Sequence, residues 1–196
     1  MYELVFASNN KNKLNEIALL LSPGITLKRI SEIGCTDDLP ETQPDIEGNA
    51  LQKARYVSEK FNVNCFADDT GLEIDALAGR PGVYSARYAG EQKNADDNMN
   101  KVLLEMKGIS NRKARFKTVI ALVWNGQDFL FEGIVEGTIA ENKNGSMGFG
   151  YDPIFIPNGY SKTFAQMDLD EKNKISHRAK AVIKLVSYLK GLPILL

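Results

Sequence analysis

The sequence predicts an α/β protein whose sheet mixes parallel and antiparallel strands. Over residues 1–70, short apolar runs alternate with segments of helical periodicity in the order β-α-β-α-β, which is typical of parallel strands joined by helices. Further along, two β-rich runs flank Asn125-Gly126, the dipeptide preferred by two-residue hairpin turns, and a hairpin adds antiparallel strands. We expect residues 1–196 to form a single domain, with the hairpin region, about 107–145, forming any second lobe.

Hydrophobic periodicity predicts the elements in the first part of the chain. Residues 2–7 are apolar and partly aromatic and run into a polar loop, which predicts a buried strand. A helix is expected over 11–21, where one helical face is apolar: Leu14, Ile17, Ala18 and Leu21. The next expected elements are a strand over 25–30, a loop over 34–45, a helix over 47–61 and a short strand over 65–67 that stops at Asp68.

The same signals continue through the rest of the chain. Residues 72–77 form either a further strand or a turn, and a helix is expected over 95–106, ended by Gly108. The expected hairpin strands, 116–124 and 129–139, are followed by a glycine-rich loop over 145–150 and a strand over 153–156. A last helix is expected over 176–190, with these residues facing inward: Ala179, Val182, Ile183, Val186 and Leu189.

The charge balance argues against a protein that binds nucleic acid. The chain has 24 Lys and Arg residues against 25 Asp and Glu residues, which gives a net charge of −1. An overall electrostatic attraction to nucleic acid needs excess positive charge, so no nucleic-acid partner is expected.

Hydropathy and cysteine usage predict a cytoplasmic protein without a membrane span. No apolar run reaches the roughly 18 residues that a transmembrane helix needs. Glu3 and the polar residues from Ser8 interrupt the apolar core that a signal peptide requires. Cys35 and Cys65 lie far apart without a Cys-x-x-Cys pair, so neither a zinc site nor a disulfide framework is indicated.

The first polar segment with functional potential is Ser8-Asn9-Asn10-Lys11-Asn12-Lys13, at the predicted strand-to-helix junction. Free backbone N–H groups and the helix dipole attract anions there, and Lys13 adds a positive charge. These features suit phosphate, although the glycine pattern of a Walker A loop is absent. The alternative is an ordinary helix cap with solvated lysines.

Two acidic segments follow. The first holds five carboxylates without a Lys or Arg: Asp37, Asp38, Glu41, Asp45 and Glu47. Such a stretch needs solvent or a bound cation, and its hard oxygen ligands suit Mg²⁺; the alternative is a solvated acidic loop.

The second acidic segment is Asp68-Asp69-Thr70-Gly71, at the expected end of a strand. Adjacent strand side chains point in different directions, so one carboxylate is free to bind a metal or polarise a water while its neighbour orients a helix or a basic residue. Thr70 and Gly71 suit a phosphate as donors. An acidic pair before glycine is equally typical of a plain turn.

Aromatic and polar residues in the last third of the chain suit a nucleobase. Phe149-Gly150-Tyr151-Asp152 offers an aromatic face beside a carboxylate, and Lys172, His177 and Arg178 lie around the start of the last predicted helix. A lone histidine is more often structural, but its polar neighbours favour ligand contact here. Together, phosphate donors, Mg²⁺ carboxylates, an aromatic face and polar groups for base edges are what a nucleoside triphosphate site needs.

The motifs resemble those of the noncanonical purine nucleoside triphosphate pyrophosphatases, the inosine triphosphatase family. The resemblance covers almost the whole chain and rests on these segments: Ser8-Asn9-Asn10-x-x-Lys13, Leu39-Pro40-Glu41, Asn49-Ala50-x3-Ala54-Arg55, Ala67-Asp68-Asp69-Thr70-Gly71-Leu72, Gly82-Val83-Tyr84-Ser85-Ala86-Arg87-Tyr88, Gly148-Phe149-Gly150-Tyr151-Asp152-Pro153-Ile154-Phe155 and Ser176-His177-Arg178. Two positions depart from the family pattern, since Ser8 and Asn9 stand where the family commonly has Thr and Gly.

The resemblance implies a fold, an activity and partners. The family fold is an elongated, two-lobed α/β structure with a long central mixed β-sheet flanked by helices and a cleft between the lobes. The family hydrolyses ITP, dITP, XTP and dXTP to the monophosphate and pyrophosphate, which keeps deaminated purines out of DNA and RNA. It uses Mg²⁺ and usually works as a homodimer.

The resemblance also implies roles for individual residues. Glu41 and Asp69 match the Mg²⁺ ligands, and Asp69 matches the general base for the attacking water. The phosphate contacts match Thr70, more loosely Lys53, and the first segment: Ser8, Asn9, Asn10, Lys11, Asn12 and Lys13. The nucleoside and base contacts match Phe149, Gly150, Tyr151, Asp152, Lys172, His177 and Arg178.

Three competing hypotheses remain open. Maf-type nucleotide pyrophosphatases share the broad fold, but the motifs at 149–152 and 176–178 argue against that class. A noncatalytic purine nucleotide sensor would not require a base such as Asp69 paired with Glu41. An RNA-binding protein would use the same aromatic face, but such surfaces usually accompany a basic groove, which the net charge does not predict.

Overall fold

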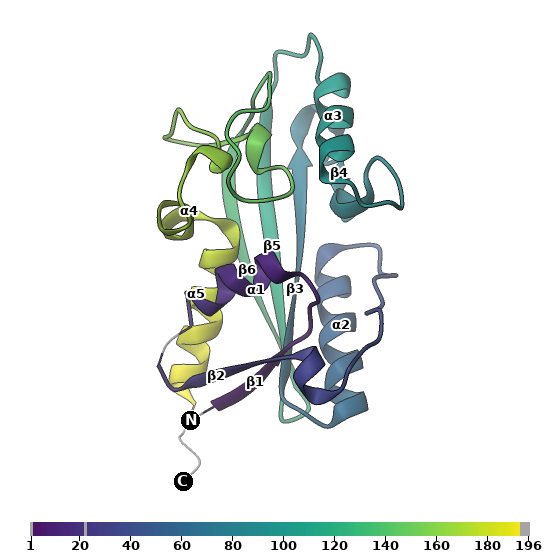
Figure 1. The fold of residues 1–196 in the computed structure, drawn as a ribbon, viewed down its shortest axis with the longest axis vertical. Helices are drawn as coiled ribbons and strands as arrows, with labels where there is room; N and C mark the ends of the chain where they lie inside the picture. The colour runs from purple at the N-terminus through teal and green to yellow at the C-terminus, as the bar shows by residue number, and fades with distance from the viewer. Residues whose placement is uncertain (1, 22, 193–196) are drawn as a thin grey trace. The chain divides into compact units, whose positions relative to one another are not determined.

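The computed structural model describes residues 2–21 and 23–192 and confirms the predicted α/β fold with a mixed sheet (Figure 1). In these residues seven strands form one sheet in the hydrogen-bonded order β2-β1-β3-β5-β6-β7, and β4 pairs with β3. The elements are β1 (Tyr2–Phe6), α1 (Lys11–Ala18), β2 (Ile25–Arg29), α2 (Ile46–Phe61), β3 (Cys65–Ile74), β4 (Pro81–Gly82), α3 (Ala95–Glu105), β5 (Lys113–Trp124), β6 (Gln127–Ile139), β7 (Phe155–Pro157), α4 (Leu169–Ile175) and α5 (His177–Gly191).

Both strand orientations occur in the sheet. β1 runs parallel to β2 and to β3, with Val5 opposite Cys65. The pairs β3–β4 and β6–β7 are antiparallel. Short 3-10 turns lie between the main elements: η1 (Ile30–Ile33), η2 (Asp75–Leu77), η3 (Ser85–Arg87), η4 (Asp152–Ile154) and η5 (Phe164–Gln166).

The chain divides into two compact units. Unit 1 takes in Met1–Asp69, Thr118–Gly133 and Arg178–Leu196, and unit 2 takes in Thr70–Lys117 and Ile134–His177. Strands β3, β5 and β6 contribute residues to both units. The segment expected to form a second lobe, 107–145, is therefore divided, because 118–133 belongs to unit 1 and the remainder to unit 2.

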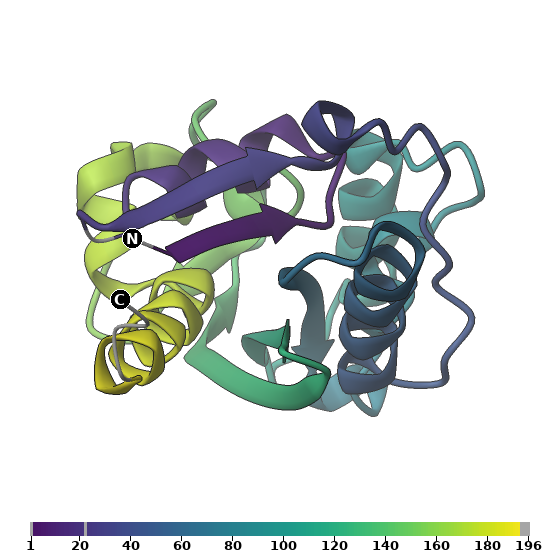
Figure 2. The same cartoon turned by 90° about the horizontal axis from the view of Figure 1, so that it is seen from below.

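The core of unit 1 joins strands to helix α5. Figure 2 shows β1 and β2 side by side in this unit. Phe6 of β1 stacks on Phe66 of β3 with ring centroids 4.9 Å apart. Residues from one face of α5 complete the same buried cluster: Ala181, Val182, Leu185, Val186 and Leu189. Burial of this apolar area is the main term that stabilises the unit.

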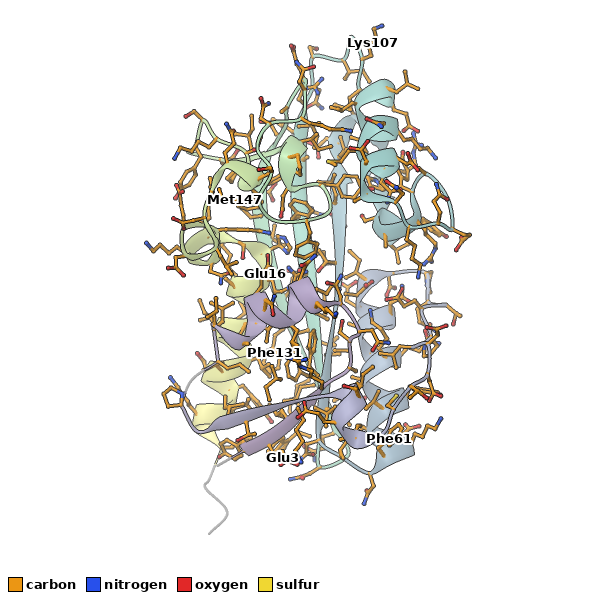
Figure 3. The ribbon with its side chains drawn as sticks, in the orientation of Figure 1. Glu3, Glu16, Phe61, Lys107, Phe131 and Met147 are labelled. Carbon is orange, nitrogen blue, oxygen red and sulfur yellow. The ribbon has the colours of Figure 1, made fainter. Side chains whose placement is uncertain are left out.

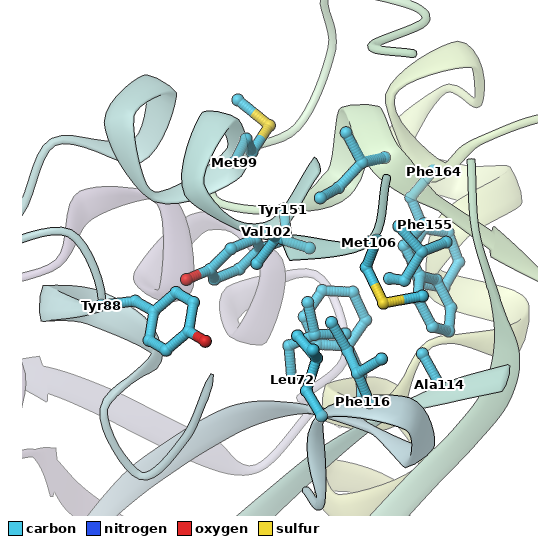
Figure 4. Packing of buried hydrophobic residues seen from close by; sticks show 14 of the residues in the cluster. Leu72, Tyr88, Met99, Val102, Met106, Ala114, Phe116, Tyr151, Phe155 and Phe164 are labelled. Carbon is cyan, nitrogen blue, oxygen red and sulfur yellow. The ribbon is translucent and has the colours of Figure 1, made fainter. Parts of the chain in front are cut away.

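The core of unit 2 is aromatic (Figure 4). Phe155 lies 4.7 Å from Phe116 and 5.3 Å from Phe164, measured between ring centroids. Tyr88 and Tyr151 lie in the same cluster, and α3 adds Met99 and Val102 to it. Such contacts add to area burial and hold the surrounding loops in place.

The most informative difference from the sequence prediction concerns β3. The prediction that a strand stops at Asp68 is wrong, because β3 runs unbroken over Cys65–Ile74. Asp68 and Asp69 stay inside the strand because basic side chains neutralise them there. An acidic pair with buried cationic partners does not need the solvent of a loop.

Smaller corrections concern the ends and faces of elements. Helix α1 ends at Ala18 rather than at 21, and the strand expected over 153–156 begins only at Phe155, because 153–154 belong to a 3-10 turn. The short helix α4 was missed, since seven residues are too few for a clear periodicity. Of the five α5 residues expected to face inward, only Ile183 does not, at 56% exposed; the other four are buried, and Leu185 is buried with them.

The hairpin prediction is confirmed. β5 ends at Trp124 and β6 begins at Gln127. Asn125 and Gly126 both have positive φ, 50° and 77°, as a type I′ turn requires.

In the described part of the chain, no helix combines the length and the apolar character needed to cross a bilayer.

Replacing Gly126 by Ala should destabilise the protein by about 1–2 kcal/mol, the cost of placing an L-residue in the left-handed region. No atom lies within 4 Å of the position that a Cβ would take, so the loss comes from the backbone and not from a clash. Gly191→Ala is the matched control, since that site is equally open and lies in α5. Urea unfolding should show a loss for Gly126→Ala only; an equal loss in both variants would contradict the assignment of the turn.

Candidate active site

Helix α1 begins just after β1, and Asn10 caps its first turn. Asn10 Oδ1 accepts hydrogen bonds from the backbone N–H groups of Asn12 (3.0 Å) and Lys13 (3.2 Å). Ser8 Oγ accepts one from the Asn10 N–H at 3.1 Å. The predicted strand-to-helix junction is confirmed, and this segment includes an ordinary Asn cap as well as the positive end of the helix dipole.

A buried charge network connects α1, β3 and α5 within unit 1. Lys13 Nζ lies 2.9 Å from Asp68 Oδ1, and Arg178 Nε donates to Asp68 Oδ2 at 3.1 Å. Arg178 Nη1 also donates to Glu16 of α1, which is labelled in Figure 3. Asp68, Glu16 and Arg178 are each no more than 3% exposed. Two carboxylates thus balance two cations inside the unit.

The network keeps Asp68 ionised. Burial raises the pKa of a carboxyl group, but at Asp68 the charges of Lys13, Arg178 and Lys53 outweigh burial and hold the pKa well below its usual range. Burial also lowers the pKa of Lys13, and Asp68 offsets this only in part. Asp68 therefore holds two cations in place and is poorly suited to accept a proton from water.

Helix α2 fixes the loop that carries Glu41. Asn49 Oδ1 accepts a hydrogen bond from the Gln43 N–H at 2.9 Å. Gln52 Oε1 accepts one from the Thr42 N–H at 2.9 Å, and Gln52 Nε2 donates to Thr42 Oγ1 at 2.8 Å. Positions three apart on a helix share a face, so α2 holds the two residues after Glu41 from one side.

Lys53, on that same face of α2, draws Glu41 and Asp69 to one point. Its Nζ lies 2.5 Å from Glu41 Oε1 and 3.3 Å from Asp69 Oδ1. Lys53 is 5% exposed and Asp69 is 9% exposed. Across residues 2–21 and 23–192, no three or more His, Cys, Asp or Glu side chains are arranged to hold a metal ion. A metal at this point would take these two carboxylates together with ligands from a substrate or water.

Asp69 differs from Asp68 in its affinity for a proton. Burial raises the pKa of Asp69 above its usual value, and the charges of Lys53 and Lys13 oppose this without cancelling it. Burial lowers the pKa of Lys53, but Asp69, Glu41 and Asp68 outweigh burial and raise it, so Lys53 stays charged. Of the two adjacent carboxylates, Asp69 is the better proton acceptor.

Unit 2 gathers three of the residues predicted to contact a nucleobase. Asp152 Oδ2 accepts a hydrogen bond from the Phe149 N–H at 2.8 Å and one from Lys172 Nζ at 2.6 Å. Lys172 Nζ also lies 5.0 Å from the centroid of the Phe149 ring, within cation–π range. Gly148 has a φ of 74°, and a Cβ there would come within 2.1 Å of Asp152 Oδ2. Position 148 therefore favours glycine, because a larger residue would collide with the Asp152 carboxylate.

His177 and Tyr151 are core residues of the same unit. His177 is 3% exposed and stacks on Phe116 with ring centroids 4.7 Å apart. Tyr151 is 5% exposed, and its hydroxyl donates to the carbonyl oxygen of Ser85 at 2.8 Å. Phe149 is partly exposed, so it is the ring of this segment better placed to stack on a ligand.

The structure does not gather the acidic stretch at one point. Asp37 accepts hydrogen bonds from Lys60 (2.5 Å) and Tyr56 (2.9 Å), and Asp45 caps α2 through the Gly48 N–H (2.7 Å). The remaining predicted residues lie in three places. Thr70 follows Asp69 in β3, Gly150 lies in the loop at a φ of 64°, and Asn9, Lys11 and Asn12 are exposed around the start of α1.

Sequence reasoning missed Glu16 and placed Arg178 beside His177 as one motif. In the structure Arg178 belongs to unit 1 and His177 to unit 2. Glu16 stands three residues after Lys13, which places both on one side of α1. A glutamate next to the inward-facing Ile17 is the signal that could have identified it.

Together these observations define an α/β protein with a buried acidic and basic group in one unit and a Phe-Asp-Lys group in the other. The chain belongs to the Ham1 family, whose sequence profile matches residues 4–188, and this match confirms the family that the motifs resemble.

Relatives and solved structures agree with this assignment. The chain is 57% identical over 187 residues to the dITP/XTP pyrophosphatase of Flavobacterium johnsoniae, which covers 95% of this chain and 97% of that protein. It is 49% identical over 195 residues to the dITP/XTP pyrophosphatase of Bacillus subtilis, covering 97% and 98%. The Ham1 protein structure from Coxiella burnetii aligns with a TM-score of 0.90 at 38% identity, covering 98% of this chain and all of that one.

Asp68→Asn should lower the free energy of unfolding by about 3–5 kcal/mol, the scale for breaking a buried ion pair. The variant leaves the buried Arg178 and the partly buried Lys13 with one carboxylate fewer. Asp128→Asn is the control, because Asp128 pairs with Arg55 where the side chains are 26% and 53% exposed. That change should cost less than about 1 kcal/mol. Chemical denaturation checks both, and equal small losses would refute the buried network.

Proposed function

We propose that this protein hydrolyses ITP, dITP, XTP and dXTP to the nucleoside monophosphate and pyrophosphate, which removes deaminated purines from the nucleotide pool. The observation that carries the proposal is the contrast between two adjacent carboxylates. Asp68 is bound by two cations, while Asp69 and Glu41 meet at one point with a raised pKa at Asp69. Relatives of 49–57% identity that span almost the whole chain are dITP/XTP pyrophosphatases, which supports the same substrates here.

In the proposed reaction Asp69 accepts a proton from the attacking water, and the lysines stabilise negative charge on the leaving group. A water oxygen bonds to the α-phosphorus, the bond from that phosphorus to the bridging oxygen of the pyrophosphate breaks, and a water proton passes to Asp69. Burial raises the pKa of Asp69 and makes it a better acceptor than an ordinary aspartate. Lys13 and Lys53 stand in the same unit and stabilise the negative charge that develops on the leaving pyrophosphate.

We also propose Glu41 and Asp69 as ligands of Mg²⁺. Their carboxylates already share one cationic partner, the ammonium of Lys53. Mg²⁺ usually takes one or two carboxylates together with substrate phosphates and waters, so this donor set fits the ion. When bound, Mg²⁺ supplies positive charge to the phosphate chain and the leaving group.

Nucleobase selectivity is assigned to Phe149 and Asp152 of unit 2 and to the predicted base contacts His177 and Arg178. Hypoxanthine presents an acceptor at O6 and a donor at N1, whereas adenine presents the reverse. Asp152 accepts hydrogen bonds when ionised, His177 and Arg178 are the predicted donors to O6, and Phe149 offers a ring for stacking. A mismatched base leaves buried polar groups unpaired at about 1–3 kcal/mol each, so ATP should be rejected.

From the family resemblance we further propose a cytoplasmic homodimer without a nucleic-acid partner. The net charge of −1 supports the absence of a nucleic-acid partner. Light scattering on the purified protein tests the dimer, for which we expect twice the chain mass of 21.7 kDa.

Pyrophosphate release from ITP, XTP, GTP and ATP, measured with and without Mg²⁺, tests the proposed reaction. We expect ITP and XTP to be cleaved far faster than GTP or ATP, and chelation of Mg²⁺ to abolish release. Binding of ITP without release would favour a nucleotide sensor, and equal rates on all four substrates would contradict the assigned selectivity.

Asp69→Asn should reduce the rate of ITP hydrolysis roughly a hundredfold or more, the usual contribution of a general base. Asp75→Asn is the matched control, because Asp75 is an exposed aspartate just after β3. Steady-state kinetics should show wild-type rates for Asp75→Asn. Near wild-type hydrolysis by Asp69→Asn would remove Asp69 from the mechanism.

A further inference from the structure

The segment Gly82–Tyr88 matches the family motifs but has no part in the proposed reaction. It runs from β4 through the 3-10 turn η3 (Ser85–Arg87) toward α3, all within unit 2. Ser85, the first residue of η3, is only 7% exposed. A buried hydroxyl in a short turn needs partners, and those partners indicate what the segment does.

Ser85 ties η3 to strand β3. Its Oγ accepts a hydrogen bond from the Leu72 N–H at 2.9 Å and donates one to the Gly82 carbonyl at 2.6 Å. Leu72 stands two residues after Thr70 in the same strand. The serine side chain therefore fixes the turn to the strand that carries a proposed phosphate contact.

Ser85 also holds the proposed base-binding loop. Its carbonyl oxygen accepts the hydroxyl hydrogen of Tyr151 at 2.8 Å. Burial raises the pKa of Tyr151, so the phenol stays protonated and remains a donor. Tyr151 stands directly before Asp152, whose carboxylate receives Lys172 and the Phe149 N–H. One residue, Ser85, is thus bonded through its side chain to β3 and through its backbone to the loop.

Helix α3 holds the turn from the other end of the motif. Asn98 is 3% exposed, donates through Nδ2 to the Ala86 carbonyl at 3.0 Å, and accepts the Ala89 N–H at 2.6 Å. These bonds leave η3 little freedom to follow a shift of the loop. Because η3 is held in this way, the hydrogen bond from Tyr151 to Ser85 fixes the position of the loop residues next to Tyr151.

We propose that Ser85 is a positioning residue that acts through Tyr151 to hold Phe149 and Asp152 in register with a purine base. The proposal rests on the function proposed above and deepens it by locating a determinant of base selectivity outside the contact residues. Hydrogen bonds weaken steeply with distance and angle, so a shift of the loop by about 1 Å weakens its discrimination between base edges.

Tyr151→Phe provides the first test, because it keeps the ring and removes the bond to Ser85. We expect the ratio of kcat/KM for ITP over GTP to fall about tenfold, mainly through a higher KM for ITP. Tyr88→Phe is the matched control. Tyr88 lies in the same core cluster (Figure 4), but its hydroxyl donates to Glu105, at 2.5 Å. The control should keep the wild-type ratio.

Ser85→Ala and Ser85→Thr provide the second test. Ser85→Ala removes the acceptor of the Leu72 N–H and should lower the same ratio, and Ser85→Thr, which keeps the hydroxyl, should restore it. The proposal is overturned if Tyr151→Phe keeps the wild-type ratio and KM, or if Tyr88→Phe lowers the ratio equally, which would indicate general loosening of the core. If wild-type protein releases no pyrophosphate from any substrate, the proposed function itself fails. That result differs from the two outcomes that overturn the role of Ser85.

Discussion

The arrangement of the site depends on charge compensation at two adjacent carboxylates inside β3. An uncompensated pair of buried aspartates would break the strand or draw water into the core. Lys13 and Arg178 bind Asp68 from α1 and α5, and Lys53 meets Asp69 from α2. Each cation comes from a different helix, so the same ion pairs that permit the strand also anchor these helices within unit 1.

The same compensation separates two chemical roles. Alternation along a strand sends adjacent side chains in different directions. Asp68 meets two cations and keeps a low pKa, whereas Asp69 is left with a raised pKa beside Glu41. Neighbouring positions thus differ in their affinity for a proton because their environments differ. The raised pKa of Asp69 is what favours it over Asp68 as the proposed general base.

The sequence predicted most of the fold, because the elements with strong periodicity or explicit turn chemistry depend on local information. The parallel strands, α2 and the Asn125-Gly126 hairpin are of this kind. It misjudged β3, because the residues that neutralise Asp68 lie 55 and 110 positions away. It also missed Glu16 and the bond of Tyr151 to Ser85, since both depend on contacts between distant segments. The sequence predicted which polar residues could take part in a site, but it did not predict which partner each of them contacts.

The proposal that Glu41 and Asp69 together hold Mg²⁺ is tested most directly by the Mg²⁺ concentration that half-activates pyrophosphate release from dITP. Glu41→Gln removes one of the two carboxylates that meet at Lys53, and Asp38→Asn removes an exposed carboxylate of the same acidic stretch. We predict that Glu41→Gln raises this concentration by about tenfold or more and that Asp38→Asn leaves it unchanged. An unchanged half-activating concentration in Glu41→Gln, or an equal rise in both variants, would contradict the proposed Mg²⁺ site.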